Sequence, residues 1–175
     1  VTDSLSVADN RISALSRDRV GTLWVGTRFG GVSRVDLNSG GFARIVRQPD
    51  APSTLSGNKV RSILDDGRGK VWIGTNSGLN LYDPASGAVR TWRHDPANPH
   101  SLSDNMVRPV LEDAKGRRWI GSFHGLDLLD RASGHFRHFR HDPQNPHSLS
   151  HDEVHYLHED KRGVLWVGTW FAGVS

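Results

Sequence analysis

The chain has 175 residues, 35% of them hydrophobic and 23% charged, which is the composition of an ordinary globular protein long enough to bury a core. Its 22 Lys and Arg residues against 19 Asp and Glu leave a formal charge of +3 with no clustered basic stripe, so nucleic acid is not expected as a partner. The absence of cysteine excludes disulfides, thiolate metal sites and a cysteine nucleophile, and no apolar run approaches the roughly 18 residues of a membrane helix, so this segment is not expected to contact a membrane.

One pattern, Asp-x-x-Gly-x-x-Trp, recurs four times along the chain. Its tryptophans are 48, 47 and 47 residues apart, and each begins a short Trp-Val/Ile-Gly-Thr/Ser segment. Self-similarity at a period of this size indicates a repeat architecture. The tryptophans are Trp24, Trp72, Trp119 and Trp166, and the aspartates six residues before them are Asp18, Asp66, Asp113 and Asp160.

The second repeat shows the expected elements most clearly. Its apolar residues alternate over short runs separated by Gly, Asp and Asn, which is typical of strands joined by tight turns. We expect turns at 65–69 and 83–87 because Gly accepts a positive φ and Asp binds its own downstream backbone. No segment has a sustained helical period. The four expected strands are 59–65, 70–75, 78–82 and 88–93.

Four short antiparallel strands in each unit of about 47 residues predict a propeller blade. We therefore expect an all-β fold, a single partial β-propeller over residues 1–175 with about 3.7 blades. The repeated tryptophans are expected to fill the wedge between neighbouring blades, and the repeated aspartates to form turns rather than to act in catalysis. The expected blades are 7–48, 55–94, 102–141 and 149–175.

The register places the end of the chain inside the third strand of the last repeat, so that blade is expected to be truncated. Propellers usually close with about 4 to 8 blades, and an open array would leave unpaired strand edges. We therefore expect either a segment of a longer propeller or a homodimer that closes through its open ends.

The second repeat also resembles a known family. The segments Leu55-Ser56-Gly57-Asn58-Lys59-Val60, Trp72-Ile73-Gly74-Thr75, Gly78-Leu79 and Tyr82-Asp83-Pro84 are similar to the two-component regulator propeller repeat. The resemblance implies an extracytoplasmic, periplasmic sensor region of a bacterial hybrid histidine kinase or of a diguanylate cyclase in cyclic-di-GMP signalling, with the output domain elsewhere. The chain has fewer repeats than such regions usually have, and it contains no recognisable kinase, cyclase or DNA-binding segment.

The loops between the second and third strands carry the side chains that vary most among the repeats. Rigid scaffolds commonly present function on one set of loops, so this face is the expected binding site for a small molecule. The aromatic rings beside Arg, Asn and His suit stacking on an oligosaccharide, whereas in the alternative interpretation Phe29, Phe123 and Phe171 pack between blades. The candidate residues are Arg28, Phe29, Asn76, Ser77, Phe123, His124, Trp170 and Phe171.

The remaining polar residues predict no catalytic or metal centre. The pairs His94-Asp95 and His141-Asp142 recur with the repeat and resemble turn sequences, so no metal and no cofactor are expected. We expect a non-enzymatic sensory or ligand-binding module. A propeller lyase or hydrolase acting on carbohydrate would need non-periodic polar residues near the channel, for which His124, Glu153 and Tyr156 are the candidates. A protein-interaction scaffold would instead need an exposed hydrophobic rim.

Overall fold

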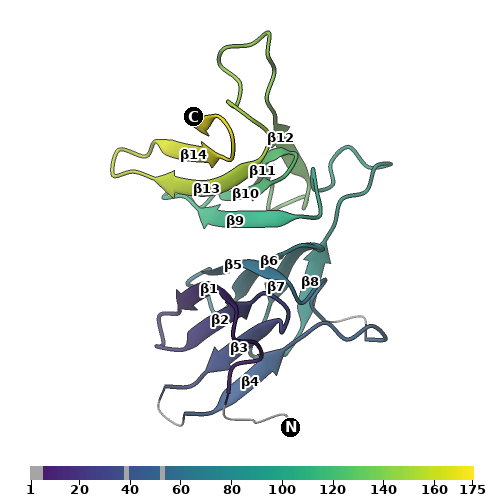
Figure 1. Ribbon diagram of the computed structural model, residues 1–175, viewed down its shortest axis with the longest axis vertical. Coiled ribbons are helices and arrows are strands. Elements are labelled where there is room, and N and C mark those ends of the chain that lie inside the picture. The colour runs from purple at the N-terminus through teal and green to yellow at the C-terminus, as the bar shows by residue number, and fades with distance from the viewer. Residues whose placement is uncertain (1–5, 38–39, 52–53) are drawn as a thin grey trace. The chain divides into compact units, whose positions relative to one another are not determined.

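The computed structural model describes residues 6–37, 40–51 and 54–175, and these residues form fifteen strands and no helix (Figure 1). The strands make four antiparallel sheets, one for each repeat, and in each sheet the strands lie side by side in chain order. We call the sheets blades 1 to 4 and their strands A to D. This arrangement confirms the predicted all-β fold of a partial β-propeller.

The strands follow the repeat closely. Blade 1 contains β1 (Ile12–Arg17), β2 (Leu23–Thr27), β3 (Val32–Val35) and β4 (Phe42–Ile45). Blade 2 contains β5 (Val60–Asp65), β6 (Val71–Thr75), β7 (Gly78–Tyr82) and β8 (Val89–Trp92). Blade 3 contains β9 (Val107–Glu112), β10 (Arg118–Ser122), β11 (Gly125–Leu129) and β12 (Phe136–Phe139), and blade 4 contains β13 (Val154–Glu159), β14 (Leu165–Thr169) and β15 (Gly173–Val174).

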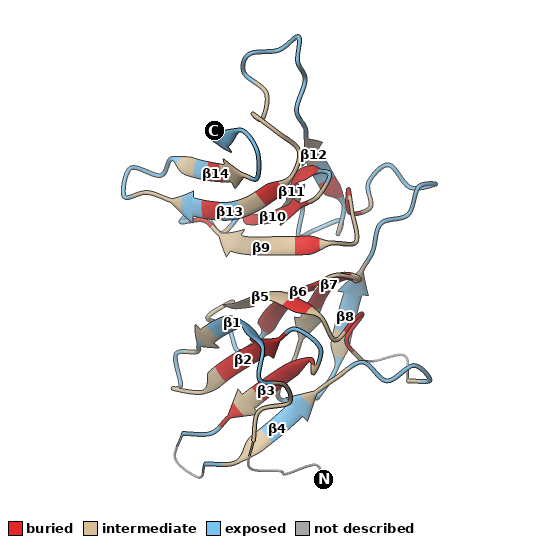
Figure 2. Ribbon diagram, in the orientation of Figure 1, coloured by how far each residue is buried: buried red, intermediate tan, exposed pale blue. Residues whose placement is uncertain are grey.

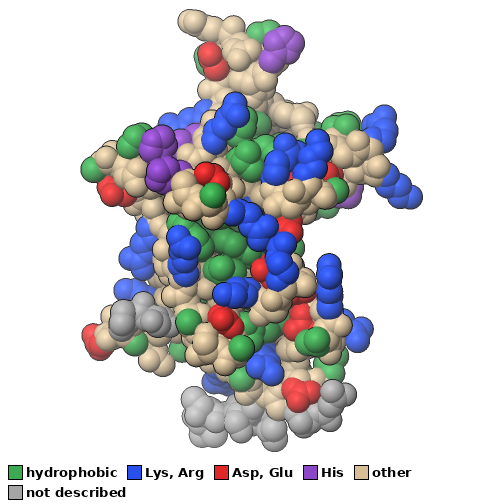
Figure 3. Space-filling view, turned by 180° about the vertical axis from the view of Figure 1, so that it is seen from behind, with side chains coloured by type: hydrophobic (Ala, Val, Ile, Leu, Met, Phe, Trp, Pro, Cys, Tyr) green, Lys and Arg blue, Asp and Glu red, His purple; other side chains and the backbone are tan. Residues whose placement is uncertain are grey.

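The chain divides into two compact units, Val1–Thr91 and Trp92–Ser175. Unit 1 holds blades 1 and 2 up to Thr91, and unit 2 holds blades 3 and 4. All ten histidines of the chain belong to unit 2. Lys and Arg side chains are scattered over the face of each unit that Figure 3 shows, interleaved with acidic and uncharged residues.

The repeated aspartates close the A–B turns. In blade 2 the Asp66 Oδ1 atom accepts hydrogen bonds from the backbone NH of Arg68 (2.8 Å) and of Lys70 (3.0 Å). The turn also needs Gly69, whose φ of 86° lies in the left-handed region that side chains with a Cβ avoid. Local hydrogen bonding by Asp therefore sets the chain reversal that the Asp/Gly pattern predicts.

In blades 1, 3 and 4 the aspartate carboxylate also accepts a hydrogen bond from the tryptophan six residues later, a contact that the turn interpretation did not include. Oδ2 of Asp113 accepts a hydrogen bond from Trp119 Nε1 at 2.9 Å, and Asp18 makes the same contact with Trp24 at 3.0 Å. Burial opposes ionisation of Asp113, but the hydrogen bonds from Trp119 and Arg117 outweigh it and lower the pKa of this carboxyl below 3.8. The turn is thereby tied to the ring of the neighbouring strand.

Two hydrophobic clusters, one in each unit, each bury one of the repeated tryptophans. Trp24 of blade 1 lies against Val60 and Ile73 of blade 2, and its ring meets that of Tyr82 edge-on at 6.0 Å. In unit 2, Trp119 belongs to a cluster that also contains residues of blade 4, namely Val154, Leu157 and Val167. Figure 2 shows the burial concentrated in the B and C strands, whereas strand D of each unit 1 blade is more exposed.

Trp72 is also buried, but Trp166 departs from the expected burial. Its side chain is 41% exposed, and its bond to Asp160 is longer, at 3.3 Å. Trp166 stands in blade 4, and no further blade in the described part of the chain covers its ring. The described residues therefore do not show the expected wedge contact for Trp166.

Candidate functional site

A β-bulge occurs at the same place in the A and B strands of every blade. In each blade the cross-strand register is interrupted opposite a glycine that lies two residues after the tryptophan. In β5, for example, the interruption lies between Val60 and Ser62. A bulge leaves its extra residue unpaired and re-aims that side chain, and bulges are frequent beside functional sites. The residues at this position are Ser13, Arg61, Arg108 and His155 in blades 1 to 4.

In unit 2 the bulge residues of both blades meet. Arg108 of blade 3 contacts His155 of blade 4, with 3.1 Å between Nη1 and Nδ1. His155 Nε2 lies 3.1 Å from Oε1 of Glu153, and the same oxygen is 3.7 Å from Arg108 Nη2. A guanidinium only donates, so His155 Nδ1 accepts from Arg108 and Nε2 carries the hydrogen that Glu153 accepts. The three side chains thus form one polar network across two blades.

Aromatic rings surround this network. The guanidinium of Arg108 lies over the Phe123 ring at 4.4 Å from its centroid, and the imidazole of His155 lies 4.4 Å from the Trp170 ring at 30°. Trp170 is 60% exposed and Phe171, perpendicular to it, is 73% exposed. We name Arg108, Phe123, Glu153, His155 and Trp170 the bulge cluster. It combines fixed polar groups with an open aromatic surface.

The corresponding end of unit 1 is more basic. Arg61 Nε donates to the side-chain oxygen of Asn76 at 2.7 Å, and Arg11 lies over the Phe29 ring at 5.2 Å. Burial, together with the positive charge of Arg28, lowers the pKa of Arg61. The bulge position of blade 1 is Ser13, whose hydroxyl donates to the carbonyl of Val60 in blade 2 at 2.8 Å and so ties the two A strands together.

The candidate residues of the B–C loops therefore separate into three groups. The first group is in unit 2, where Phe123 and Trp170 belong to the bulge cluster and Phe171 contacts Trp170. The second group lies in unit 1 and consists of Arg28, Phe29, Asn76 and Ser77, whose side chain packs against Gly57. His124 pairs with Asp104 instead. Counted from the tryptophans, Phe123 corresponds to Trp170 and Phe29 to Phe171, so the three phenylalanines do not occupy one equivalent position in the repeat.

Other polar candidates lie elsewhere. Glu153 belongs to the bulge cluster, whereas Tyr156 is 64% exposed on β13. His94 and His141 each place Nδ1 within hydrogen-bonding distance of a carbonyl eight residues on, Leu102 (2.7 Å) and Leu149 (2.6 Å), inside their own D–A loops. Arg108 and His155 are not among the residues predicted from the sequence, although the variability of the bulge position among the repeats is the signal that marks them.

Comparison with known proteins follows the repeat. The profile of the two component regulator propeller family matches residues 6–29, 54–77 and 148–171, which contain the A strand, the A–B turn and the B strand of blades 1, 2 and 4. Three of the four repeats of this chain therefore match the two-component regulator propeller repeat. The Leu-Ser segment, the aspartate turn and the Trp-Val/Ile-Gly-Thr strand of this propeller are thus the parts that it shares with its relatives.

Solved structures agree with the family. The extracellular domain of BT3049 from B. thetaiotaomicron, described as a hybrid two component system, superimposes with a TM-score of 0.83 at 23% identity over 97% of this chain and 23% of that one. That of BT4673 from the same organism has a TM-score of 0.79 at 26% identity, over 97% and 21%. The propeller segment thus spans less than a quarter of these extracellular domains.

Two further proteins are similar to parts of the chain or to its fold. Histidine kinase P4 of Formosa agariphila is 32% identical over 59 residues, which are 34% of this chain and 4% of that protein. Virginiamycin B lyase from Staphylococcus aureus has a TM-score of 0.63 at 16% identity, over 94% of this chain and 54% of that one. The second likeness concerns the fold alone. The described residues contain no helix long and apolar enough to cross a membrane.

Proposed function

We propose that this chain is a non-catalytic, ligand-binding segment of a periplasmic sensor region in a bacterial signalling protein. The extracellular domains of two-component systems that share its repeats support this role and location. The output domain, a histidine kinase or a diguanylate cyclase, would lie elsewhere in the parent protein. Because a fold does not fix a function, the ligand has to be argued from the site itself.

The ligand proposed for the bulge cluster is an oligosaccharide. The observation that carries this proposal is the exposed Trp170 ring, which lies beside the polar network of Arg108, Glu153 and His155. An aromatic face offers a flat apolar surface for the CH groups of a sugar ring, while Arg108 and Glu153 supply a donor and an acceptor for its hydroxyls. The network holds these groups in place before the ligand arrives, which lowers the ordering cost of binding.

Titration of the protein with cello-, xylo- and manno-oligosaccharides, followed by calorimetry, tests this assignment. Trp170→Ala should weaken the binding of the best oligosaccharide at least about tenfold, which corresponds to ~1.4 kcal/mol. Tyr156→Ala is the matched control, since Tyr156 is a similarly exposed aromatic residue of blade 4 outside the bulge cluster, and it should bind as the parent does.

Two results would contradict the proposal. Equal weakening by both substitutions would mean that exposed aromatic residues bind sugar without a defined site. Conversion of an oligosaccharide to products, abolished by His155→Ala, would assign catalysis to the Glu153 and His155 pair in place of sensing. Mass spectrometry of the titrated samples distinguishes these outcomes.

A further inference from the structure

A cavity of ≈340 Å³ lies in unit 1, between blades 1 and 2. It opens at the end of the blades that carries the A–B turns, whereas the B–C loops lie at the other end of each blade. Cavities of about 300 Å³ are at the small end of ligand-binding pockets, so a molecule the size of a monosaccharide fits best. We call it the turn-end cavity, and the lining residues that matter are Arg19, Trp24, Arg34, Asp65, Gly67 and Pro84.

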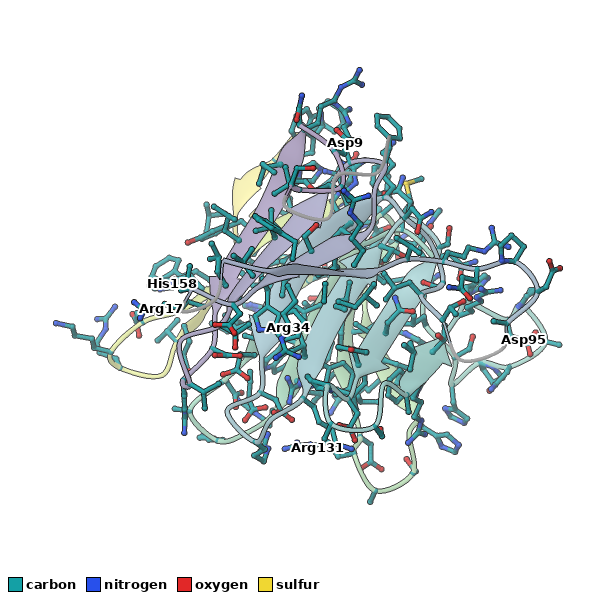
Figure 4. All side chains as sticks on the ribbon, turned by 90° about the horizontal axis from the view of Figure 1, so that it is seen from below. Asp9, Arg17, Arg34, Asp95, Arg131 and His158 are labelled. Carbon is teal, nitrogen blue, oxygen red and sulfur yellow. The ribbon has the colours of Figure 1, made fainter. Side chains whose placement is uncertain are left out.

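Arg34 is the residue that sets this cavity apart from the repeat. It pairs across the sheet with Trp24, and in blades 2 and 3 the residues that pair with the equivalent tryptophans are Leu81 and Leu128. One blade therefore carries a guanidinium beside the buried tryptophan where the others carry a leucine. Figure 4 shows Arg34 toward the Arg17 end of blade 1, away from Asp9.

Arg34 is a partly buried residue that lines the cavity, and its guanidinium has no hydrogen bond or ion pair with any residue in the described part of the chain. Taking a charged group out of water without a partner costs free energy, so such a position is costly for stability alone. A leucine would also fit the apolar surroundings of Trp24 better. The charge is therefore explained best by a ligand.

A second cation lies at the rim. The Arg19 guanidinium packs on the backbone of Gly67 in blade 2, where an added Cβ would lie 2.7 Å from Arg19 Cζ. The Asp18 carboxylate, in contrast, is already engaged by Trp24 Nε1 and by the backbone NH of Thr22 and Val20. The lining of the cavity thus contains two arginines, one carboxylate besides Asp18, that of Asp65, and the apolar surface of Pro84.

We propose that the turn-end cavity binds a small organic carboxylate, with the carboxylate on Arg34 and the apolar part of the ligand against Trp24 and Pro84. A guanidinium presents two parallel NH groups that match the two oxygens of a carboxylate, so this pairing has both strength and a defined geometry. The site is independent of the oligosaccharide proposed for the bulge cluster, because it uses different residues in the other unit.

The experiment follows the Trp24 indole NH signal by ¹H–¹⁵N NMR during titration with D-glucuronate, with D-glucose and D-glucose 6-phosphate in parallel. Glucuronate should saturate and shift this signal, and glucose should not. Arg34→Leu places at this position the residue found in blades 2 and 3, so the variant should fold at least as stably, and its affinity for glucuronate should fall at least about tenfold. Arg131→Leu, the same charge change in the C–D turn of unit 2, should leave binding unchanged.

An unchanged affinity in Arg34→Leu, or an equal loss in Arg131→Leu, would overturn the site. Binding of glucose as tight as that of glucuronate would show that the carboxylate is not recognised, and tighter binding of the 6-phosphate would assign the cavity to phosphate instead. Absence of any glucuronate binding would overturn the proposal as well, whatever the result at the bulge cluster.

Discussion

One buried position on strand C differs from blade to blade and has a different chemistry in each. It is Ser33 in blade 1, Asn80 in blade 2 and Asp127 in blade 3. The side chain of Asn80 accepts a hydrogen bond from the backbone NH of Ser56 at 2.8 Å, and that of Asp127 accepts one from the backbone NH of Ser103 at 3.0 Å. Each side chain therefore holds the Leu-Ser pair, Leu55-Ser56 or Leu102-Ser103, that precedes strand A of its own blade. The repeat therefore requires an acceptor here, but it does not require a charge.

The charge of Asp127 makes the stability of blade 3 depend on pH. Burial raises the pKa of Asp127, outweighing the hydrogen bonds from His138 and Ser103. The folded state then holds this proton more tightly than the unfolded state does, so the stabilisation is present below the ordinary carboxyl pKa and is lost as the pH rises through the raised value. Asp127→Asn should be more stable than the parent at neutral pH, on the order of 1 kcal/mol, with the difference vanishing in acid.

Urea unfolding across the acidic range measures this difference, and Asp113→Asn is the opposite control. The lowered pKa of Asp113 gives a stabilisation that is present at neutral pH and is lost as the pH falls, so its asparagine variant should be the less stable one at neutral pH. Parallel pH profiles for Asp127→Asn and the parent would show that burial does not control the ionisation of Asp127.

At the scale of the strand, the glycine opposite the bulge in blades 1 and 3 lets the next blade approach. A Cβ on Gly26 would lie 2.6 Å from Val60 Cγ1, and one on Gly121 would lie 2.6 Å from Val154 Cγ1. Neither position requires a positive φ, so the glycine is needed for space and not for backbone conformation. Close packing of successive A strands therefore depends on the missing side chain.

Gly121→Ala should destabilise unit 2 by about 1–3 kcal/mol, because the new methyl group overpacks the contact with Val154 and Pro109. Gly168→Ala makes the same change in blade 4, where the three nearest atoms all belong to Tyr156 of the same blade and the nearest, its Cβ, lies at 3.1 Å. Its cost should be clearly smaller. Thermal unfolding compares the two variants, and equal losses would mean that the inter-blade approach is not what the glycine protects.

The sequence allowed the strands to be predicted within one residue in blade 2, since alternation and turn glycines are local signals. Arg108 and His155 were not predicted as site residues, because a bulge sets the direction of their side chains. The bulge is evident only from the cross-strand register. Arg34 was not predicted for a related reason. The B–C turn of blade 1 is one residue longer than that of blade 2, so an alignment of the repeats without gaps places Arg34 opposite Tyr82. In the sheets, however, Arg34 pairs with its tryptophan as Leu81 does in blade 2.

At the scale of the whole molecule, each unit has its own hydrophobic cluster. Trp24, Val60 and Ile73 belong to the cluster of unit 1, and Trp119, Val154 and Leu157 to that of unit 2. In repeat proteins the stability is close to a sum of terms within repeats and between nearest neighbours, so a local loss stays largely local. The two units should accordingly respond differently to substitutions in their separate cores.

Val60→Ala and Val154→Ala test this, since both residues are fully buried at the same position of strand A in blades 2 and 4. Each substitution should cost about 2 kcal/mol through the lost methyl groups and the cavity left behind. Hydrogen exchange read by mass spectrometry should show lost protection mainly in β1 to β7 for Val60→Ala and mainly in β9 to β14 for Val154→Ala. Uniform loss across all blades with either variant would mean that the chain unfolds as one cooperative body, in which the two clusters do not act separately.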